Sequence, residues 1–309
     1  MGDICFMGGY HNNLGAAATV LAGVADDLSQ ADITFGNLEQ AVTNGGSPWP
    51  EKTWTFRSPP EDLQGLYQSG FDIVSLANNH ALDYGRAGFE DTLEAFADSD
   101  LLQVGGGPTL ADAWTPRIIE LADGTTVAFL AFSEIGPAEF AATDTQPGVA
   151  YTNSIADITA AVAAAAVQAD YTLVSMHWGI ENEPPPTERQ VSEGRAIIDA
   201  GADVVLGGHP HIIQGIEFYG GGLINYSFGN FVFSPGADTG NDTYILHLTL
   251  TPDGVVDVAA VPVRLHNAAP QLAEGATLDR LLAEITTQSA ARGTTVTVSA
   301  GRALLTPPA

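Results

Sequence analysis

The chain has 309 residues, of which 45% are hydrophobic and 15% are charged, a composition that predicts a folded globular protein and excludes a disordered one. Ten Lys and Arg stand against 37 Asp and Glu, a formal net charge of −27. A surface this acidic lacks the basic patch that binding to nucleic acid or to an anionic membrane requires.

Apolar runs alternate with helical patterns through the first two thirds of the chain, which is typical of an α/β protein with parallel strands. Strands are expected at 33–35, 71–76, 127–132, 172–176 and 204–206. Helices are expected between them at 16–28, 61–68, 87–97, 155–167 and 187–200. Two helix starts are signalled locally: Pro60 suits a first helical turn, and Thr187 precedes Gln190 at the spacing of a capping box.

Strands dominate after Gly208, with candidates at 213–218, 223–226, 244–250 and 255–263. Pro252, Asp253 and Gly254 predict a hairpin turn between the last two. One amphipathic helix is expected at 278–285, and we assign no structure to the Thr- and Ala-rich end that follows it. We expect one domain over 1–267, with a C-terminal helix and tail, 268–309, packed on the domain or trailing from it.

The segment from Thr43 to Pro59 is too long and too rich in large side chains for a passive connection. It carries Trp49, Trp54, Lys52 and Arg57. The two cations are suited to bind an anionic group of a substrate, and the alternative is that both are ordinary solvated side chains.

The single cysteine, Cys5, excludes an internal disulfide and a Cys-rich zinc module. No apolar stretch approaches the length of a membrane span, and the first residues lack the pattern of a signal peptide. The chain as it stands predicts a soluble, cytoplasmic protein, or an extracytoplasmic one if an N-terminal anchor or signal has been removed. Because the carboxylates are scattered and form no run, we favour surface solvation over cation gathering as the reason for the acidity.

Side chains that bind metals or transfer protons follow the predicted strands, at the edge of an open α/β sheet where ligands bind. Four of the seven histidines fall in these segments. The segments are Gly2-Asp3 with Cys5, Asn37-Leu38-Glu39, Asn78-Asn79-His80, His177-Trp178-Gly179 with Glu181, and Gly208-His209-Pro210-His211.

The donors in these segments are mixed nitrogen and oxygen, which suits two divalent ions, Mn, Fe or Zn, better than one structural zinc. His209 and His211 are separated by one rigid proline, so both imidazoles can reach a metal; the alternative is an ordinary surface loop. Glu39 is a carboxylate ligand or a solvated side chain at a helix start. Cys5 is more often a small buried side chain, and its place two residues after Asp3 keeps thiolate ligation open.

Two ions about 3.5 to 4 Å apart can activate water and clamp the oxygens of a hydrolytic transition state. His80, beside Asn79, is then available to stabilise developing charge or to protonate a leaving group. The alternative for His80 is a histidine hydrogen-bonded at the sheet rim.

These motifs resemble those of the calcineurin-like metallophosphoesterases: an aspartate motif, an acidic motif, Asn-His, a lone His and Gly-His-x-His. Longer strings resemble the CapA family, named for poly-γ-glutamate capsule synthesis, over about Gly2 to Phe233. They are FRSPPE, GFDIVSLANNHALDYG, HWGIENEPPPTERQ, DAGADVVLGGHPHIIQGIE and INYSFGNFVF.

The resemblance implies a four-layer α-β-β-α sandwich of two mixed sheets flanked by helices, with a dinuclear site at the strand ends. Carried over residue by residue, it implies His80 as the catalytic acid, Glu39 as the bridging carboxylate, and Glu181, in the family's His-Trp-Gly-x-Glu motif, as a residue that orients a ligand or meets substrate. It implies as further metal ligands Asp3, Asn79, His177, His209 and His211, and Asn37 joins Arg57 and Lys52 as a candidate substrate contact.

The sequence departs from the superfamily pattern in three places. Asp3-Ile4-Cys5 replaces Asp-x-His, so one metal lacks an imidazole, and Gly36-Asn37-Leu38-Glu39 replaces the usual acidic motif. Only Met1 and Gly2 stand where a strand is expected before Asp3, so this strand is expected to be missing or rebuilt and Asp3 poorly held.

The leading hypothesis is a CapA-like metal-dependent hydrolase acting on a phosphoester or on a γ-glutamyl amide or ester, as a small molecule or a polyglutamate-type chain. A second hypothesis is a non-hydrolytic component of poly-γ-glutamate synthesis or export that binds the polymer. A third is a metal-free structural relative. The sequence leaves the oligomeric state open.

Overall fold

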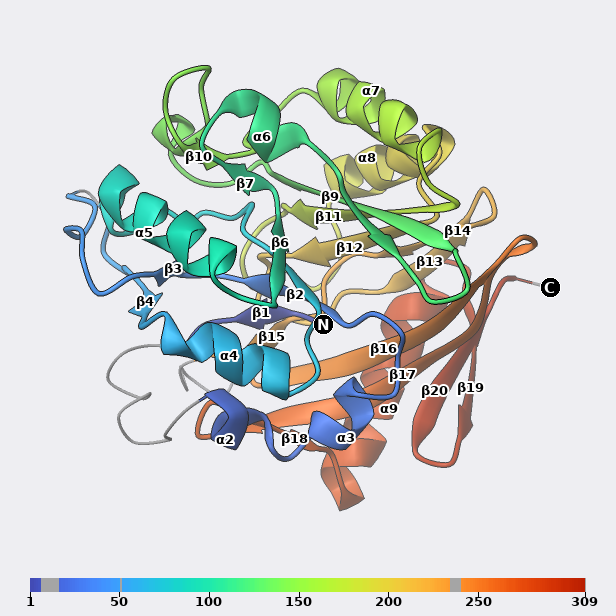
Figure 1. Ribbon diagram of the computed structural model, residues 1–309. Helices are drawn as coiled ribbons and strands as arrows, with labels where there is room; N and C mark the ends of the chain where they lie inside the picture. Colours follow the sequence, from blue (N-terminus) through green and yellow to red (C-terminus); the bar gives the residue numbers. More distant parts are fainter. Residues whose placement is uncertain (7–16, 51, 234–239, 309) are drawn as a thin grey trace.

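Two β-sheets lie face to face at the centre of the computed structural model, which describes residues 1–6, 17–50, 52–233 and 240–308 (Figure 1). The first sheet is parallel, and its described strands are ordered β15 (Asn230–Val232), β1 (Asp3–Ile4), β2 (Phe35–Leu38), β5 (Ile73–Ser75) and β6 (Leu102–Val104).

The second sheet is mixed: its inner strands are parallel, and an antiparallel strand lies at each edge. Its described strands are ordered β13 (Ile216–Tyr219), β14 (Gly222–Asn225), β12 (Val204–Gly208), β11 (Tyr171–His177), β9 (Thr126–Ser133) and β8 (Arg117–Glu120).

Strand β9 shows why these segments form central strands. Successive side chains of a strand point to opposite faces, so a strand that is buried on both faces needs an uninterrupted apolar run. Val127 and Phe129 pack toward the first sheet, whereas Leu130 and Phe132 pack toward the outer helices. The ring of Phe129 stacks on that of Phe35 from β2, with 5.8 Å between centroids, and so joins the two sheets directly.

Helices cover the outer face of each sheet and complete four layers (Figure 1). The first sheet is covered by α2 (Ala17–Leu21), α3 (Ala25–Leu28), α4 (Glu61–Gln68) and α5 (Gly85–Ala97). The second is covered by α6 (Leu110–Trp114), α7 (Ile155–Ala166) and α8 (Glu188–Asp199). A short 3-10 helix, η1, spans Ala138–Phe140. This is the α-β-β-α sandwich that the resemblance implied, except that the first sheet is parallel rather than mixed over its described strands.

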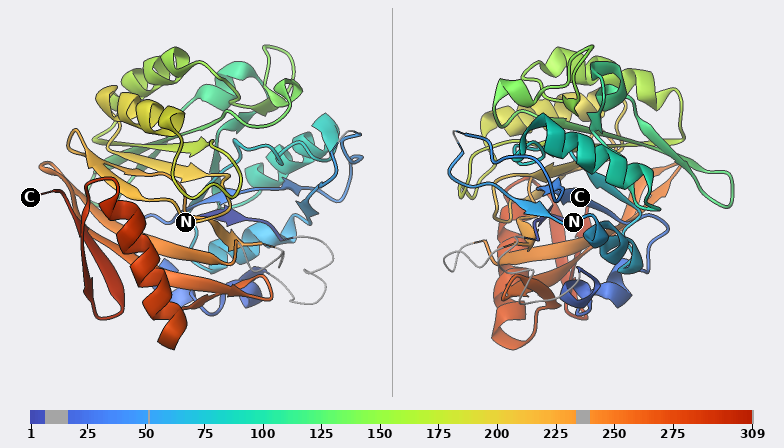
Figure 2. Two further views of the ribbon diagram at one scale, coloured as in Figure 1. Left: turned by 180° about the vertical axis from the view of Figure 1, so that it is seen from behind. Right: turned by 60° about the vertical axis from the view of Figure 1, so that its left-hand side comes forward.

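The C-terminal part adds a third, antiparallel sheet and a long helix beside the sandwich (Figure 2). Residues from this part, such as Tyr244, Leu281 and Leu305, share one core with residues of both central sheets. The strands are β16 (Asp242–Thr251), β17 (Gly254–His266), β18 (Ala269–Leu272), β19 (Thr295–Ser299) and β20 (Arg302–Thr306), and the helix is α9 (Gly275–Ala290).

Two short ladders fasten loops near the carboxyl ends of the central strands. In one, β3 (Ala41–Val42) pairs with β4 (Arg57–Ser58), which closes the segment between them into a loop. In the other, β7 (Gly106–Gly107) pairs with β10 (Gly148–Val149).

The sequence predicted most of the regular elements to within a few residues. Helix α4 has the expected bounds, and the capping box of Thr187 and Gln190 is present at the start of α8. Pro252 and Asp253 form the turn of the β16–β17 hairpin, because Thr251 pairs with Gly254. The strand expected at 33–35 is displaced and forms at Phe35–Leu38.

Three expectations were wrong. The helix expected at 16–28 is broken between α2 and α3, and residue 16 lies outside the described residues. Gly23 stands at the break, where the backbone lies so close to Pro270 that a Cβ would be 2.9 Å from the Pro270 carbonyl oxygen. The end of the chain is structured, because β19 and β20 form a hairpin that extends the third sheet. Asp3 is firmly held, since β1 pairs with β15 on one side and β2 on the other.

Within the described part of the chain, no helix combines the length and the apolar character needed to cross a bilayer. The boundary at 267 and 268 stays a prediction.

Candidate metal centre

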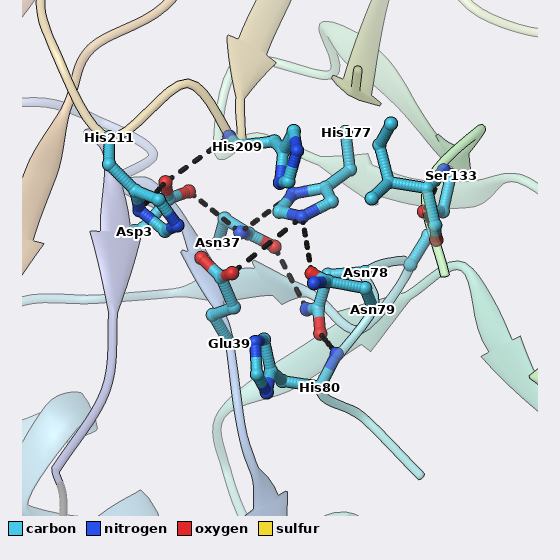
Figure 3. A network of polar contacts seen from close by, with 12 residues as sticks. Asp3, Asn37, Glu39, Asn78, Asn79, His80, Ser133, His177, His209 and His211 are labelled. Carbon is cyan, nitrogen blue, oxygen red and sulfur yellow. Dashed lines mark hydrogen bonds and ion pairs between the residues drawn. The ribbon is translucent and has the colours of Figure 1, made fainter. Parts of the chain in front are cut away.

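The candidate ligands gather where parallel strands of both sheets end (Figure 3). Asp3 lies on β1, and Glu39 directly follows β2. Asn79 follows β5, His177 ends β11, and the segment with His209 follows β12. Because the two sheets stack with these edges together, residues more than 200 positions apart in sequence come into contact, as Asp3 and His209 do.

Asp3 is fully buried and is held by hydrogen bonds from two sides. Asn37 donates from Nδ2 to Asp3 Oδ1 at 2.8 Å, and the backbone N–H of His209 donates to Oδ2 at 3.2 Å. Burial raises the pKa of Asp3, but the hydrogen bond and charge of His211, aided by the charge of His177, outweigh burial and lower the pKa to about 2. Asp3 is therefore an ionised carboxylate at neutral pH.

Glu39 is also fully buried, yet neither of its carboxylate oxygens receives a hydrogen bond from the described residues. Its Oε1 lies 3.7 Å from Nε2 of His177. Burial, and then the negative charge of Asp3, raise the pKa of Glu39 well above its ordinary value. Buried polar groups are almost always paired, and an unpaired buried carboxylate is costly, so this arrangement fits a bound cation.

Three imidazoles surround the carboxylates. Ring centroids of His177 and His209 are 4.9 Å apart, and those of His209 and His211 are 5.8 Å apart. His209 and His211 have φ angles of 93° and 59°, a left-handed backbone that is unfavourable for residues other than glycine. Such strain is typical of functional sites, and here it turns both rings of Gly-His-Pro-His toward the carboxylates (Figure 3).

The pKa values of the three imidazoles diverge. Burial lowers the pKa of His177 well below its usual range and that of His209 to about 4, which leaves both neutral, as metal ligands must be. For His211 burial acts in the same direction, but the charges of Glu39 and Asp3 outweigh it and raise the pKa to about 10.

The side chains form two overlapping groups whose ligand atoms lie within 4.8 Å of one another. Asp3, Glu39 and His211 make the first group, and Glu39, His177 and His209 make the second. Asn79 adds an amide oxygen to the second group, since its Oδ1 is 2.8 Å from His177 Nε2. The shared carboxylate and the mixed nitrogen and oxygen donors fit divalent cations.

Glu181 and Cys5 occupy different places around the cluster. Glu181 is exposed, and its carboxylate forms a third close group with His209 and His211, at the open side of the site. Cys5 is buried and belongs to none of the ligand groups found among the described residues. Burial and then the charge of Glu39 raise the pKa of its thiol, so the geometry supports the packing interpretation, and ligation by Cys5 stays a prediction.

His80 is fixed from several directions. Its Nδ1 lies 2.6 Å from Oδ2 of Asp83, and its ring stacks on Phe56 with 4.2 Å between centroids. Its backbone N–H donates to Oδ1 of Asn78. Burial lowers the pKa of His80, and the hydrogen bond that His80 donates to Asp83 opposes this only in part. Figure 3 shows His80 beside Asn79 and near Glu39.

The predicted substrate contacts separate into two kinds. Asn37 lies inside the cluster, where it also approaches Nδ1 of His177 at 3.4 Å. Lys52 contacts the Asn79 carbonyl oxygen and Nδ1 of His80. Arg57 binds the Gly45 carbonyl and lies over the Tyr84 ring, 4.4 Å from its centroid, so it reaches none of the candidate ligands.

Sequence reasoning assigned no role to three residues that support the site. Asn78 donates to Asn37 Oδ1 and to the Leu38 carbonyl, and Asp83 pairs with His80. The amide oxygen of Asn230 lies 2.8 Å from Nδ1 of His211. All three lie within the sequence segments that carry the family resemblance. For Asp83 the spacing was a signal that could have found it, because it stands three positions after His80.

The fold and the site together define an α-β-β-α sandwich with a candidate metal centre at its strand ends. Residues 1–235 match the family model described as bacterial capsule synthesis protein PGA_cap. The chain belongs to this family.

Curated relatives carry names from capsule and polymer synthesis. The chain is 35% identical over 241 residues to the PGA biosynthesis protein CapA of Bacillus subtilis, covering 78% of this chain and 63% of the relative. It is 32% identical over 258 residues to the capsule biosynthesis protein CapA of Bacillus anthracis, covering 82% and 62%. A candidate polyglutamine synthesis accessory protein of Mycobacterium tuberculosis is 29% identical over 268 residues, covering 81% and 69%. The chain thus spans less than two thirds of the two Bacillus relatives.

Two solved structures are similar in part. The NAD nucleotidase NadN of Haemophilus influenzae matches with a TM-score of 0.45 and 13% identity, over 73% of this chain and 48% of that one. A candidate 5′-nucleotidase of Staphylococcus aureus matches with a TM-score of 0.48 and 15% identity, over 84% and 49%.

Proposed function

We propose that this chain is a metal-dependent hydrolase that holds two divalent ions, Mn, Fe or Zn. The observation that carries the proposal is Glu39, a fully buried carboxylate without a hydrogen-bond donor, shared by two overlapping ligand groups. Divalent cations held by these two groups would compensate the charge of a carboxylate in this position.

When bound, the ions supply Lewis-acid polarisation of the substrate and activation of water. The protein's own residues then have distinct tasks. Asn37 fixes Asp3 through its hydrogen bond, and Asn230 fixes His211. His80, oriented by Asp83, is the side chain available to give a proton to the leaving group. Glu181, on the open side of the site, is available to contact substrate.

The proposed substrate is a phosphoester or a γ-glutamyl amide or ester. The names of the curated relatives support a link to poly-γ-glutamate, and the two-metal arrangement suits either bond because both reactions develop charge on oxygen. A screen of both substrate classes with metal-loaded protein separates them. If the metal-loaded protein hydrolyses neither substrate class, the proposal is contradicted.

A second candidate is a non-hydrolytic component of polymer synthesis that binds the chain, which the accessory role in the name of the mycobacterial relative favours. The net charge of −27 opposes it, since a polyglutamate chain is repelled unless bound cations intervene. A metal-free structural relative is the least supported alternative, because it would leave Glu39 buried and unpaired.

Metal analysis tests the proposal before any substrate is known. We expect about two equivalents of Mn, Fe or Zn in the wild-type protein and a loss in His209→Ala, with a fold that circular dichroism reports as intact. His247→Ala is the matched control, because His247 is a half-buried imidazole of β16 that belongs to none of the ligand groups among the described residues. Wild-type protein without metal after reconstitution would overturn the proposal.

A further inference from the structure

The chain has one lysine, Lys52, and it lies against the candidate catalytic acid. Only 16% of its side chain is exposed. Its Nζ is 2.5 Å from Asp83 Oδ1, 2.5 Å from the Asn79 carbonyl oxygen and 3.1 Å from His80 Nδ1. The loop between β3 and β4 thus reaches across to hold the segment that carries Asn79 and His80.

Asp83 connects Lys52 to His80 because both of its oxygens are engaged. Oδ1 accepts from Lys52, whereas Oδ2 accepts from the Phe56 backbone N–H at 2.7 Å and lies 2.6 Å from His80 Nδ1. The carboxylate is fully buried. Since a carboxylate only accepts, the short contact keeps a proton on Nδ1, so Nε2 is the nitrogen that takes up a proton and gives it to the leaving group.

A buried carboxylate can turn about its Cβ–Cγ bond unless both oxygens are held. Lys52 holds Oδ1, and this keeps Oδ2 aimed at the ring of His80, which Phe56 supports on one face. Lys52 also compensates the charge of Asp83, in a chain where cations are scarce.

We infer that Lys52 is a positioning residue that acts through Asp83 to orient His80 for proton transfer. The inference rests on the proposed function for the role of His80, but the contact itself has a test that needs no substrate. The rival explanation is that Lys52 only stabilises the fold.

The chain offers a matched ion pair to separate these explanations. Arg195 on α8 binds Glu217 on β13 with 2.5 Å between Nη2 and Oε1, the same kind of pair between a partly exposed cation and a buried carboxylate. Glu217 also accepts from Tyr226 and touches none of the candidate ligands. Arg195→Met therefore reports what loss of such a pair does to stability alone.

In Lys52→Met we expect kcat to fall by about 10- to 100-fold, the usual effect of removing a residue that orients a functional side chain, while KM and bound metal stay at wild-type values. Arg195→Met should lower the melting temperature without lowering kcat. Wild-type kcat in Lys52→Met overturns the inference.

A rescue distinguishes a missing ammonium group from general damage. Cys5 is 1% exposed, so Lys52→Cys carries one accessible thiol, and aminoethylation of that thiol restores an ammonium group on a side chain of nearly the same length. We expect the modified protein to regain kcat. A folded, fully modified protein that remains as slow as Lys52→Met would contradict the role.

The substrate-free test is proton NMR of the Nδ1–H of His80. A short hydrogen bond to a buried carboxylate gives a far-downfield resonance, which Asp83→Asn assigns by removing it. We expect this resonance in wild type, its loss in Lys52→Met and its return after aminoethylation. If wild type shows the resonance but hydrolyses nothing, the proposed function fails and the contact stands. Its persistence in folded Lys52→Met, or its absence from wild type, overturns the inference.

Discussion

Two buried glutamates differ in whether their carboxylates have hydrogen-bond partners. Glu217 is paired with Arg195 and Tyr226, whereas Glu39 receives no hydrogen bond from the described residues. Both are almost fully buried. Their replacement by glutamine should therefore change stability in opposite directions.

Glu39→Gln is expected to stabilise the metal-free protein by about 1–3 kcal/mol at pH 7, because it removes an unpaired buried charge. The raised pKa of Glu39 gives the sign: the ionised residue destabilises the fold above its ordinary pKa of 4.5, so the gain should vanish as the pH falls below that value. Thermal unfolding with and without Mn measures both effects, since the variant should also lose the stabilisation that metal gives.

Glu217→Gln is the control and should destabilise the protein, since it breaks a paired buried group. Equal destabilisation by both variants would show that Glu39 has a partner in the folded protein, which would weaken the proposed metal site.

The positions of the candidate ligands were predictable, but their supporting partners were not. His177, His209 and Glu39 follow apolar runs that identify strands, and parallel strand ends meet at one edge. Lys52 lies in a loop without periodicity, so nothing in its local pattern connects it to Asp83. Contacts between loops depend on the path of the chain in space, which one sequence does not reveal.

At the scale of elements, strand β12 packs very closely against its neighbours just before the segment that carries the candidate ligand His209. Gly207 precedes the Gly-His-Pro-His segment, and a Cβ at this position would be 2.0 Å from the Tyr226 carbonyl oxygen and 2.7 Å from the indole nitrogen of Trp178. That indole N–H donates to the same carbonyl at 3.0 Å. The site therefore needs glycine for space.

Gly207→Ala is expected to destabilise the protein by more than about 2 kcal/mol, because the backbone carbonyl cannot move away as a side chain would. Urea denaturation measures the change. Gly124→Ala is a useful comparison: it has open space around it and a φ of 88°, so only left-handed strain of about 1 kcal/mol is expected. Equal costs at the two positions would contradict the role assigned to close packing.

Elements with long apolar runs were predictable, and very short or exposed ones were not. β9 is buried on both faces over most of its length, whereas β1, β3 and β4 have two residues each and show no period. β19 is mostly exposed, and Thr and Ser alternate with its two valines, so its sequence resembles a polar tail, although β19 pairs with β20. These strands form because they pair with other strands of the fold, and their local sequence pattern does not show this pairing.

For the whole molecule, the C-terminal part matters because it shares a core with the sandwich. Leu281 and Ile285 of α9 and Leu305 of β20 lie in the same cluster as Phe129 and Val204 of the second sheet. These side chains would lose their burial, and the sandwich would lose its cover, if the part after 267 were removed.

A chain that ends at 267 is therefore expected to lose its cooperative thermal transition, because both α9 and the β19–β20 hairpin are gone. A chain that ends at 293 keeps α9 and should unfold cooperatively at a reduced temperature. Calorimetry compares the two with the full chain. If the chain that ends at 267 unfolds with the same calorimetric transition as the full chain, residues 1–267 are a domain by themselves.

The single lysine also determines how this protein responds to amine chemistry. Dyes, cross-linkers and solid supports that react with primary amines usually attach at many places on a protein surface. Here the one side-chain amine lies in an ion pair beside His80. A reagent that couples to the lysine of this protein is therefore expected to report on the surroundings of His80, and bound metal or substrate should be readable as protection from labelling.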